Sequence, residues 1–427
     1  MSRAVRLAAL AFASALILPA SAAQAKGGAC LPDYPHGAHC HVWTGKVKQV
    51  DDGDTLDASV PGDGLGGTLR VRIIGIQAME LTSYRTAARA GDCHAVDATR
   101  RLEQLVKRSK GKIRVSALYT GSRSRGRRLR SIAVRRGKHW RDVGRILVSE
   151  GLALWWPGLA EDASNARYSL LSQKAAAAHK GLFAPEACGI GPNQGHPIGL
   201  WAQWDADGND RDDVNGEYVK IRNYDVNNWL PLSGWYLRDS GLRRFTFPPG
   251  SAIPPNSSVT VYAGEGEDAG TDFYWGLGAP VFENASKANP DIGDGAYLFD
   301  PLGNIRASMI YPCKVACSNP AKGSIAMSAQ PKKDEYVTLS NTGAAPIDLE
   351  QYVLKSLPYS YAFAQGTTLA PGQTIRVHTQ GDPSEDTATD RYWGMDKQIL
   401  DNSGDVAELD AYNDVEIACT AYGSKSC

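Results

Sequence analysis

Two closely spaced carboxylates mark the first part of the chain that could do chemistry. Asp52 and Asp54 flank a glycine in the segment Asp51-Asp52-Gly53-Asp54-Thr55, which lies between two runs typical of β-strands. A tight turn there would present both carboxylates on one short arc, which suits a hard cation such as calcium. Taken alone, the same pattern is also that of an ordinary hairpin turn.

An alternating segment, Thr68 to Ile76, predicts the next strand and carries a charged side chain within it. Arg72 would face the side opposite to Ile73, and a buried arginine needs an anionic partner. Glu80 follows just beyond the strand, where a loop could direct it at a bound water. Either residue alone also fits a solvated surface charge.

A third element is Arg125-Gly126-Arg127-Arg128-Leu129, at the start of another predicted strand. A lone basic run is usually a solvated face, but here Gly126 puts flexible backbone beside Arg127 where the strand begins. Phosphodiester hydrolysis needs a cation and planar donors to hold the phosphoryl oxygens, and a base to activate water. Two arginines, one glutamate and an aspartate cluster supply those groups, and the arginine fork matches two phosphate oxygens.

The order and spacing of these residues resemble the staphylococcal (thermonuclease-type) nuclease family. The resemblance covers roughly residues 42–190 and includes Leu147-Val148-Ser149-Glu150-Gly151-Leu152-Ala153. It implies an OB-fold five-stranded barrel with helices, and calcium-dependent hydrolysis of DNA and RNA. It also implies site roles: Asp54 as a direct metal ligand with Asp52 one layer behind it, Glu80 as general base, and Arg72 and Arg127 as phosphate clamps.

The chain departs from that family at the expected metal site. Gln77 stands where the family carries a second metal-binding Asp, and Ala78 would supply the backbone carbonyl ligand. Glutamine offers an oxygen without charge, so we expect a weaker calcium site, because affinity depends on ligand charge. Met79 also replaces the family's proline before Glu80. The alternative is therefore a weakly active or inactive extracellular nucleic-acid-binding protein.

Beyond residue 190 the pattern changes to short β-rich runs separated by Pro, Gly and Asn turns, which is typical of β-sandwiches. Glu217-Tyr218-Val219 recurs 118 residues later as Glu335-Tyr336-Val337, and Tyr274-Trp275-Gly276 returns as Tyr392-Trp393-Gly394. Anchors repeated in the same order indicate two copies of one domain. Both copies resemble the lamin-tail family, an immunoglobulin-like sandwich, which implies modules for binding or tethering.

We therefore expect a mainly β protein: an OB-fold five-stranded barrel with helices, followed by two immunoglobulin-like β-sandwiches. Helices are expected only beside the barrel, at Asp97–Ser109, Val143–Glu150 and Arg167–Lys180. The predicted divisions are a signal peptide at 1–25, an N-terminal arm at 26–41, the nuclease-like domain at 42–190, and sandwiches at 191–314 and 318–427.

The formal net charge of zero hides a division between the two halves. Residues 26–190 hold 27 Lys and Arg against 15 Asp and Glu, whereas residues 191–427 hold 17 against 31. A basic module followed by an acidic one makes the first the candidate for a polyanionic partner, here DNA or RNA as substrate.

The first residues read as a secretory signal. Arg3 and Arg6 supply the positive start, the apolar run from Leu7 to about Leu18 is too short to span a bilayer, and Ala23-Gln24-Ala25 offers a cleavage site. The alternative is an N-terminal membrane anchor. We expect a secreted or cell-surface-associated monomer with no transmembrane segment in the mature chain.

Eight cysteines, an even number, agree with export. Three pairs lie close in sequence, which leaves Cys93 with Cys188, although spacing alone does not settle the connectivity. A zinc site is the rival interpretation, disfavoured because no Cys-x-x-Cys pair occurs. The expected bridges are Cys30–Cys40, Cys93–Cys188, Cys313–Cys317 and Cys419–Cys427.

A separate acidic segment precedes the first sandwich. In Asp205-Ala206-Asp207-Gly208-Asn209-Asp210 the oxygen-bearing residues alternate, as they do in calcium loops. Asp205, Asp207 and Asn209 are therefore a candidate structural calcium site. No glutamate closes the loop as in an EF-hand, so a solvated acidic lead-in is the alternative.

Overall fold

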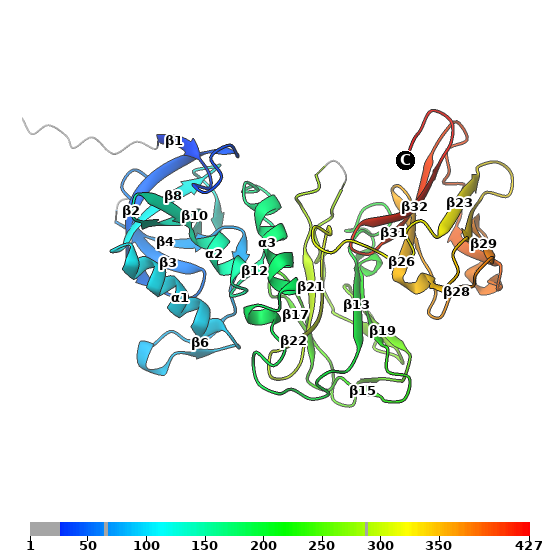
Figure 1. Cartoon of the computed structure of the whole chain (residues 1–427), viewed down its shortest axis with the longest axis horizontal. Helices are drawn as coiled ribbons and strands as arrows, with labels where there is room; N and C mark the ends of the chain where they lie inside the picture. Colours follow the sequence, from blue (N-terminus) through cyan, green and yellow to red (C-terminus); the bar gives the residue numbers. More distant parts are fainter. Residues whose placement is uncertain (1–25, 64–66, 287–288) are drawn as a thin grey trace, which may run out of the picture.

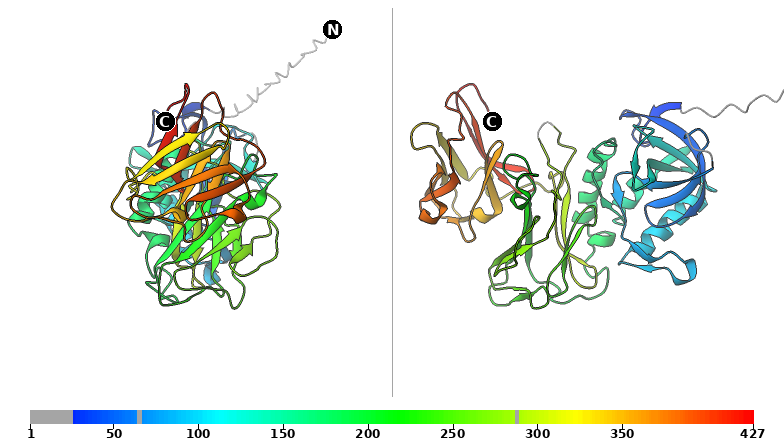
Figure 2. Two further views of the ribbon diagram at one scale, coloured as in Figure 1. Left: turned by 90° about the vertical axis from the view of Figure 1, so that its right-hand side faces the viewer. Right: turned by 180° about the vertical axis from the view of Figure 1, so that it is seen from behind.

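The computed structural model describes residues 26–63, 67–286 and 289–427. These residues form three β-rich units in a row, with a barrel at one end and the C-terminal sandwich at the other (Figure 1, Figure 2). The secretory signal predicted for residues 1–25 lies outside this part of the chain. Among the described helices, none has both the length and the apolar character needed to cross a bilayer.

The first unit is a closed five-stranded barrel, as expected for an OB-fold. Strand β2 pairs with β3 and β8, β3 with β4, β4 in parallel with β10, and β10 with β8, which closes the ring. Alternation buries Leu69, Val71 and Ile73 inside it. The strands are β2 (His39–Val50), β3 (Thr55–Ser59), β4 (Thr68–Ile73), β8 (Lys112–Ala117) and β10 (Arg127–Arg136).

Three helices lie beside the barrel close to their predicted positions: α1 (Ala95–Arg108), α2 (Val143–Ser149) and α3 (Asn165–Ala177). Helix α1 packs an apolar face that includes Leu102 and Leu105 against the barrel core. At the start of α2, the carboxylate of Asp142 accepts hydrogen bonds from the Gly144 amide (3.2 Å) and the Tyr168 hydroxyl (2.7 Å). This buried aspartate thus joins α2 to α3.

The strand predicted to run to Ile76 ends earlier, at Ile73. Gly75 has a φ of +77°, which turns the chain where residues with a Cβ are strained. The next residues form a separate short strand, β5 (Ile76–Gln77), which pairs with β12 (Leu154–Trp155) instead of continuing the barrel. That turn directs residues 77–80 back across the end of the barrel.

The two C-terminal units are β-sandwiches with the same strand order. The first pairs β13-β14-β19-β20 and β17-β16-β21-β22, and the second pairs β23-β24-β29-β30 and β27-β26-β31-β32. The first contains β13 (Ile198–Gln203), β14 (Tyr218–Asn223), β16 (Tyr236–Asp239), β17 (Arg244–Thr246), β19 (Ser258–Tyr262), β20 (Asp272–Tyr274), β21 (Gly295–Phe299) and β22 (Ile305–Ile310). The second contains β23 (Ile325–Gln330), β24 (Tyr336–Asn341), β26 (Tyr352–Ser356), β27 (Tyr359–Ala362), β29 (Thr374–Gln380), β30 (Asp390–Met395), β31 (Val406–Ala411) and β32 (Val415–Ala421).

The repeated glutamate has the same structural task in both sandwiches. Glu217 is buried and accepts hydrogen bonds from the backbone amides of Val281 (2.7 Å) and Phe282 (3.3 Å). Glu335 accepts them from the amides of Ile399 and Leu400, which lie 118 residues further on. The sequence repeat therefore reflects a carboxylate that fixes an irregular segment to the start of β14 or β24.

The barrel and the first sandwich share one apolar core. Helix α3 lies between them (Figure 1), and Tyr236, Tyr297, Phe299 and Ile310 belong to the same buried cluster as the barrel residues. Tyr236 and Phe299 stack with ring centroids 4.9 Å apart. This apolar contact fixes the first sandwich against the barrel, unlike a module on a free linker.

Four disulfide bonds join all eight cysteines: Cys30–Cys40, Cys93–Cys188, Cys313–Cys317 and Cys419–Cys427. These are the pairs expected from the spacing. Four disulfides in one chain are typical of an extracellular protein.

Candidate active site

The aspartate turn is buried and packed between two other elements, unlike a solvent-exposed hairpin. Asp52 and Asp54 are both buried at the β2–β3 turn, and the Asp54 amide donates a hydrogen bond to the Asp52 carboxylate over 3.0 Å. A Cβ at Gly53 would lie 2.6 Å from the Cβ of Ala98 in α1 and 2.7 Å from that of Ala78. Only glycine fits this approach, which brings the turn into contact with the segment that precedes Glu80.

Asp54 is held by that segment. Its Oδ2 accepts a hydrogen bond from the Ala78 amide (2.7 Å), and its Oδ1 accepts one from the Thr55 hydroxyl (3.0 Å) and pairs with Arg72. Burial raises the pKa of the adjacent Asp52 carboxyl, and the positive charge of Arg72 opposes that effect. The two carboxylates therefore remain close to a cation, which here is Arg72.

Arg72 is buried at the end of β4, where a strand-surface charge would have been exposed. Its guanidinium pairs with Asp54 and donates hydrogen bonds to the Gln77 side-chain oxygen and to the Ile76 carbonyl, the latter over 3.1 Å. Burial, followed by the charge of Arg127, lowers the pKa of Arg72 to about 10, so it stays protonated at neutral pH. Its Nε is buried without a hydrogen-bond partner among the described residues. An anion would satisfy this group.

Gln77 links the expected metal ligands to Glu80. Its amide nitrogen donates to the Ala78 carbonyl oxygen and to a Glu80 carboxylate oxygen, both over 3.0 Å. Glu80 itself is exposed. The exposed carboxylate at the edge of a buried polar cluster has the access to water that a general base requires.

Arg127 reaches the same cluster from β10, the strand that lies next to β4. Arg125 and Gly126 form the turn between β9 (Arg123–Ser124) and β10, with φ values of +48° and +80°, as in a hairpin turn with glycine at its second position. The Arg127 Nη1 donates to the Thr55 hydroxyl over 3.3 Å. The fold thus brings together all the site residues expected of the barrel: Asp52, Asp54, Arg72, Gln77, Ala78, Glu80 and Arg127.

A cavity of about 200 Å³ opens beside these residues. On the barrel side, its walls are Arg72, Gln77, Glu80, Arg125, Arg127 and Trp156. Three arginines and one glutamate give this side a positive balance, which favours an anionic ligand.

The opposite wall belongs to the first sandwich and was not expected from the sequence. Asp239, Gly241, Arg243, Glu283 and Asp294 line it. Burial raises the pKa of Asp239 to about 6, and burial together with the charge of Asp239 raises the pKa of Asp294 well above its usual value. These residues lie at sandwich loops and strand ends with no local motif, so no sequence signal marked them.

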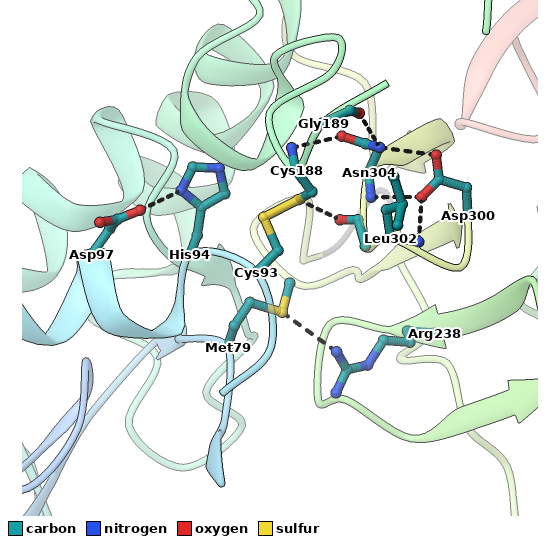
Figure 3. The surroundings of a disulfide bond; sticks show 11 residues. Met79, Cys93, His94, Asp97, Cys188, Gly189, Arg238, Asp300, Leu302 and Asn304 are labelled. Carbon is teal, nitrogen blue, oxygen red and sulfur yellow. Dashed lines mark hydrogen bonds and ion pairs between the residues drawn. A yellow bond between two sulfur atoms is a disulfide. The ribbon is translucent and has the colours of Figure 1, made fainter. Parts of the chain in front are cut away.

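The loop that follows Glu80 is also held by the first sandwich (Figure 3). It contains β6 (Leu81–Ser83) and β7 (Ala90–Gly91), and the Asp92 amide donates to the Glu80 carbonyl over 3.0 Å. Cys93 is bonded to Cys188, whose amide donates to the Asn304 side chain over 2.8 Å. The base of the loop is therefore closed on Glu80, and its end is fastened to the sandwich through Cys188.

Each of the three residues predicted to hold a structural calcium, Asp205, Asp207 and Asn209, accepts a hydrogen bond from another residue of the chain. Asp205 accepts a hydrogen bond from Asn284 (2.8 Å), and Asn209 accepts one from the Arg211 amide (3.2 Å). Asp207 accepts hydrogen bonds from the amide (2.6 Å) and hydroxyl (3.0 Å) of Ser360 in the second sandwich. The segment therefore helps to join the two sandwiches.

Comparison with known proteins identifies the C-terminal half. The family model described as Lamin Tail Domain matches residues 202–312 and 321–424, one match to each sandwich and together half of the chain. No curated protein matches the chain. The barrel lies outside the matched segments, and no nuclease family model matches it. From the paired match and the two sandwiches, the chain belongs to the lamin tail domain family.

Proposed function

We propose that the protein is an exported, calcium-dependent nuclease that hydrolyses phosphodiester bonds of DNA or RNA at the end of the barrel. One observation carries the proposal: Arg72 from β4 pairs with the buried carboxylate of Asp54, and one further residue links each of the other two groups to this pair. Arg127 is linked to Asp54 through Thr55, and Glu80 is linked to Arg72 through Gln77. Four disulfide bonds support export.

The chain's own groups have distinct tasks in this proposal. Arg72 and Arg127 would each donate hydrogen bonds to the phosphoryl oxygens, where negative charge develops during hydrolysis. Glu80 would accept a proton from the attacking water, since it is exposed and its carboxylate is oriented by Gln77. Because Arg72 is already fixed by Asp54 and Gln77, little reorganisation would be needed when phosphate binds.

The donor set beside Arg72 fits calcium in type. Asp54 offers a carboxylate, Gln77 and Ala78 offer carbonyl oxygens, and Asp52 lies behind Asp54, all of which are hard oxygen donors. When bound, calcium would withdraw charge from the phosphoryl group. The single direct carboxylate, which also neutralises Arg72, predicts weaker affinity than a site with two.

The second candidate is a nucleic-acid-binding protein with little or no catalysis. The pairing of Arg72 with both Asp54 and Gln77 favours it, because a guanidinium satisfies the oxygens that a metal would otherwise bind. In either case, the second sandwich, which lies farthest from the barrel (Figure 2), is the better placed of the two for binding or tethering to a surface.

The test is incubation of the purified protein with plasmid DNA and with RNA, in calcium and in calcium with excess chelator. We expect cleavage that needs calcium. Binding of nucleic acid without cleavage in calcium would favour the second candidate and reject the nuclease.

A further inference from the structure

We propose that the cavity between the barrel and the first sandwich binds one nucleotide of a single-stranded nucleic acid, with Arg243 of the sandwich as a phosphate-binding residue and Trp156 as the surface on which the base stacks. The inference rests on the proposed function and adds to it a substrate-binding wall from outside the barrel. It gives the first lamin tail domain a part in substrate recognition as well as in architecture.

The wall is fixed in place. The same apolar core runs from the barrel through α3 into β16, β21 and β22, and Tyr297 and Phe299 are fully buried within it. A polar contact reinforces the core, because the Arg238 guanidinium pairs with Asp92 over 3.5 Å. The side chains that face the Arg72–Arg127 cluster are therefore held at a constant separation, as a preformed ligand site requires.

Arg243 has the geometry of a phosphate donor. Its Nη1 donates to the Val281 carbonyl over 2.9 Å and lies 3.6 Å from Asp239, which orients the guanidinium plane. The side chain is 52% exposed and lines the cavity. Among the described residues, no hydrogen bond involves its Nε or Nη2. An edge of an oriented guanidinium with free donors matches two oxygens of a phosphate.

The position of Arg243 is set by the repeated glutamate described above. Glu217 fixes the amides of Val281 and Phe282, and the carbonyl of Val281 holds Arg243. The neighbouring carboxylates carry less charge than their number suggests, because burial and the nearby Asp239 favour the protonated form of Asp294 by raising its pKa. The sandwich wall can therefore accept an anion despite its three acidic residues.

Trp156 supplies the apolar surface in the same cavity. It is half-buried, and its ring centroid lies 5.8 Å from the guanidinium carbon of Arg72. A Cβ at Gly241 would lie 3.2 Å from the Trp156 ring nitrogen, so the two walls approach closely there. Aromatic rings beside basic side chains are the usual platform for unpaired bases, since every base has a π-face.

The size of the cavity favours unpaired nucleotides over base pairs. A cavity of about 200 Å³ has room for one base with its phosphate but not for a base pair. A paired base cannot reach Trp156 without leaving its stack, which costs free energy. Single strands, frayed ends and unpaired loops are therefore the expected substrates.

The experiment measures binding by fluorescence anisotropy with a fluorescein-labelled oligothymidylate of about twelve nucleotides and a blunt hairpin duplex. Calcium is present, and every protein carries Glu80→Ala so that cleavage, slowed by about 10²–10³, is negligible during the measurement. We expect the single strand to bind at least about tenfold more tightly than the duplex. Arg243→Gln and Trp156→Leu should each weaken single-strand binding about tenfold, and Trp156→Phe should retain most of it.

Arg376→Gln is the matched control, because it removes an equally exposed arginine (53%) from β29 in the second sandwich, at the other end of the molecule from the barrel (Figure 1). Melting temperatures are measured for all variants. An unchanged melting temperature shows that weaker binding comes from a lost contact with the nucleic acid and not from a disturbed fold. Single-strand binding unchanged in both Arg243→Gln and Trp156→Leu would overturn this inference, even if the parent protein cleaves nucleic acid. If Arg243 and Trp156 bind single strands as expected but the protein with Glu80 intact cleaves no nucleic acid, the proposed function would be overturned instead.

Discussion

Arg238 of the first sandwich donates a hydrogen bond to the sulfur of Met79 over 3.4 Å (Figure 3), and Glu80 is the next residue in the chain. Met79 is buried, and it stands where the resemblance to the nuclease family implies a proline. A flexible thioether can fill an irregular gap and contact a neighbouring group, whereas proline would restrict the backbone by itself. In this chain the segment before Glu80 is therefore positioned by a second domain.

Removing either of the two proposed reacting groups of the barrel, Arg127 or Glu80, should slow cleavage. Arg127→Ala and Glu80→Ala should each lower kcat by about 10²–10³, since each removes a preorganised group that acts in the transition state. The fold should persist, because Glu80 is exposed and Arg127 makes one long hydrogen bond, to Thr55. Plasmid cleavage rates and circular dichroism check both statements.

Arg136→Ala is the control for that pair, because Arg136 is an exposed arginine at the other end of the same strand, β10. It should cleave at nearly the parent rate. If Arg127→Ala and Glu80→Ala behaved like Arg136→Ala, the assignment of the active site would be wrong.

Gln77→Asp should tighten calcium binding. A carboxylate at position 77 would add a negative charge beside Asp54 and could still accept the hydrogen bond that Arg72 now donates to the amide oxygen. One added charge at about 4 Å contributes about 1 kcal/mol even in water, so the Kd should fall about fivefold or more. Calorimetric titration with calcium measures it.

The comparison for this substitution is Gln49→Glu, which adds the same charge on β2 next to Asp51 without facing the metal donors. An equal gain in both variants would indicate a general charge effect, and no gain in Gln77→Asp would place residue 77 away from the metal.

Local patterns were sufficient to predict much of the fold. Alternating residues marked the barrel strands, and the 118-residue offset between Glu217 and Glu335 predicted the two sandwiches, whose strand orders are the same. Both features can be seen in the sequence itself, the first as alternation within each strand and the second as a repeat of one domain. The early end of β4 was missed because Gly75 interrupts a run that is apolar on both sides.

The contacts within the site, and its wall from the first sandwich, could not be predicted from the sequence. The pairing of Arg72 with Asp54 depends on strand register, and the cavity wall depends on contacts such as Arg238 to Met79, 159 residues apart in sequence. Arg243 and Asp239 lie among ordinary sandwich residues. Contacts of this kind follow from how the domains dock, which no local periodicity encodes.

Buried Glu217 should make the stability of the first sandwich depend on pH. Burial raises the pKa of Glu217 to about 8, from an ordinary value of 4.5. Between these values the folded state binds a proton that the unfolded chain lacks, so the free energy of unfolding should fall as pH rises from about 4.5 to about 8. Glu217→Gln keeps the acceptor oxygen for Val281 and Phe282 and removes this proton.

The melting temperature of Glu217→Gln should therefore match the parent near pH 5 and exceed it near pH 9. Scanning calorimetry across that range is the measurement, with Glu265→Gln, an exposed glutamate, as the control for net charge. If the melting temperatures of the parent and of Glu217→Gln differ by the same amount at every pH from 5 to 9, then Glu217 does not bind a proton in the folded state.

The bridge between Cys93 and Cys188 should stabilise both the barrel and its active site. It closes a loop of 95 residues, for which the chain-entropy model gives roughly 4–5 kcal/mol, against roughly 2–3 kcal/mol for the 8-residue loop of Cys419–Cys427. The double variant Cys93→Ser/Cys188→Ser should lower the first melting transition and also reduce kcat severalfold, because the bridge from Cys93 (Figure 3) anchors the end of the loop that starts after Glu80. The double variant Cys419→Ser/Cys427→Ser should leave kcat unchanged. Non-reducing peptide mapping checks the pairing itself, and equal kcat values in the two double variants would show that the bridge stabilises the fold without positioning Glu80.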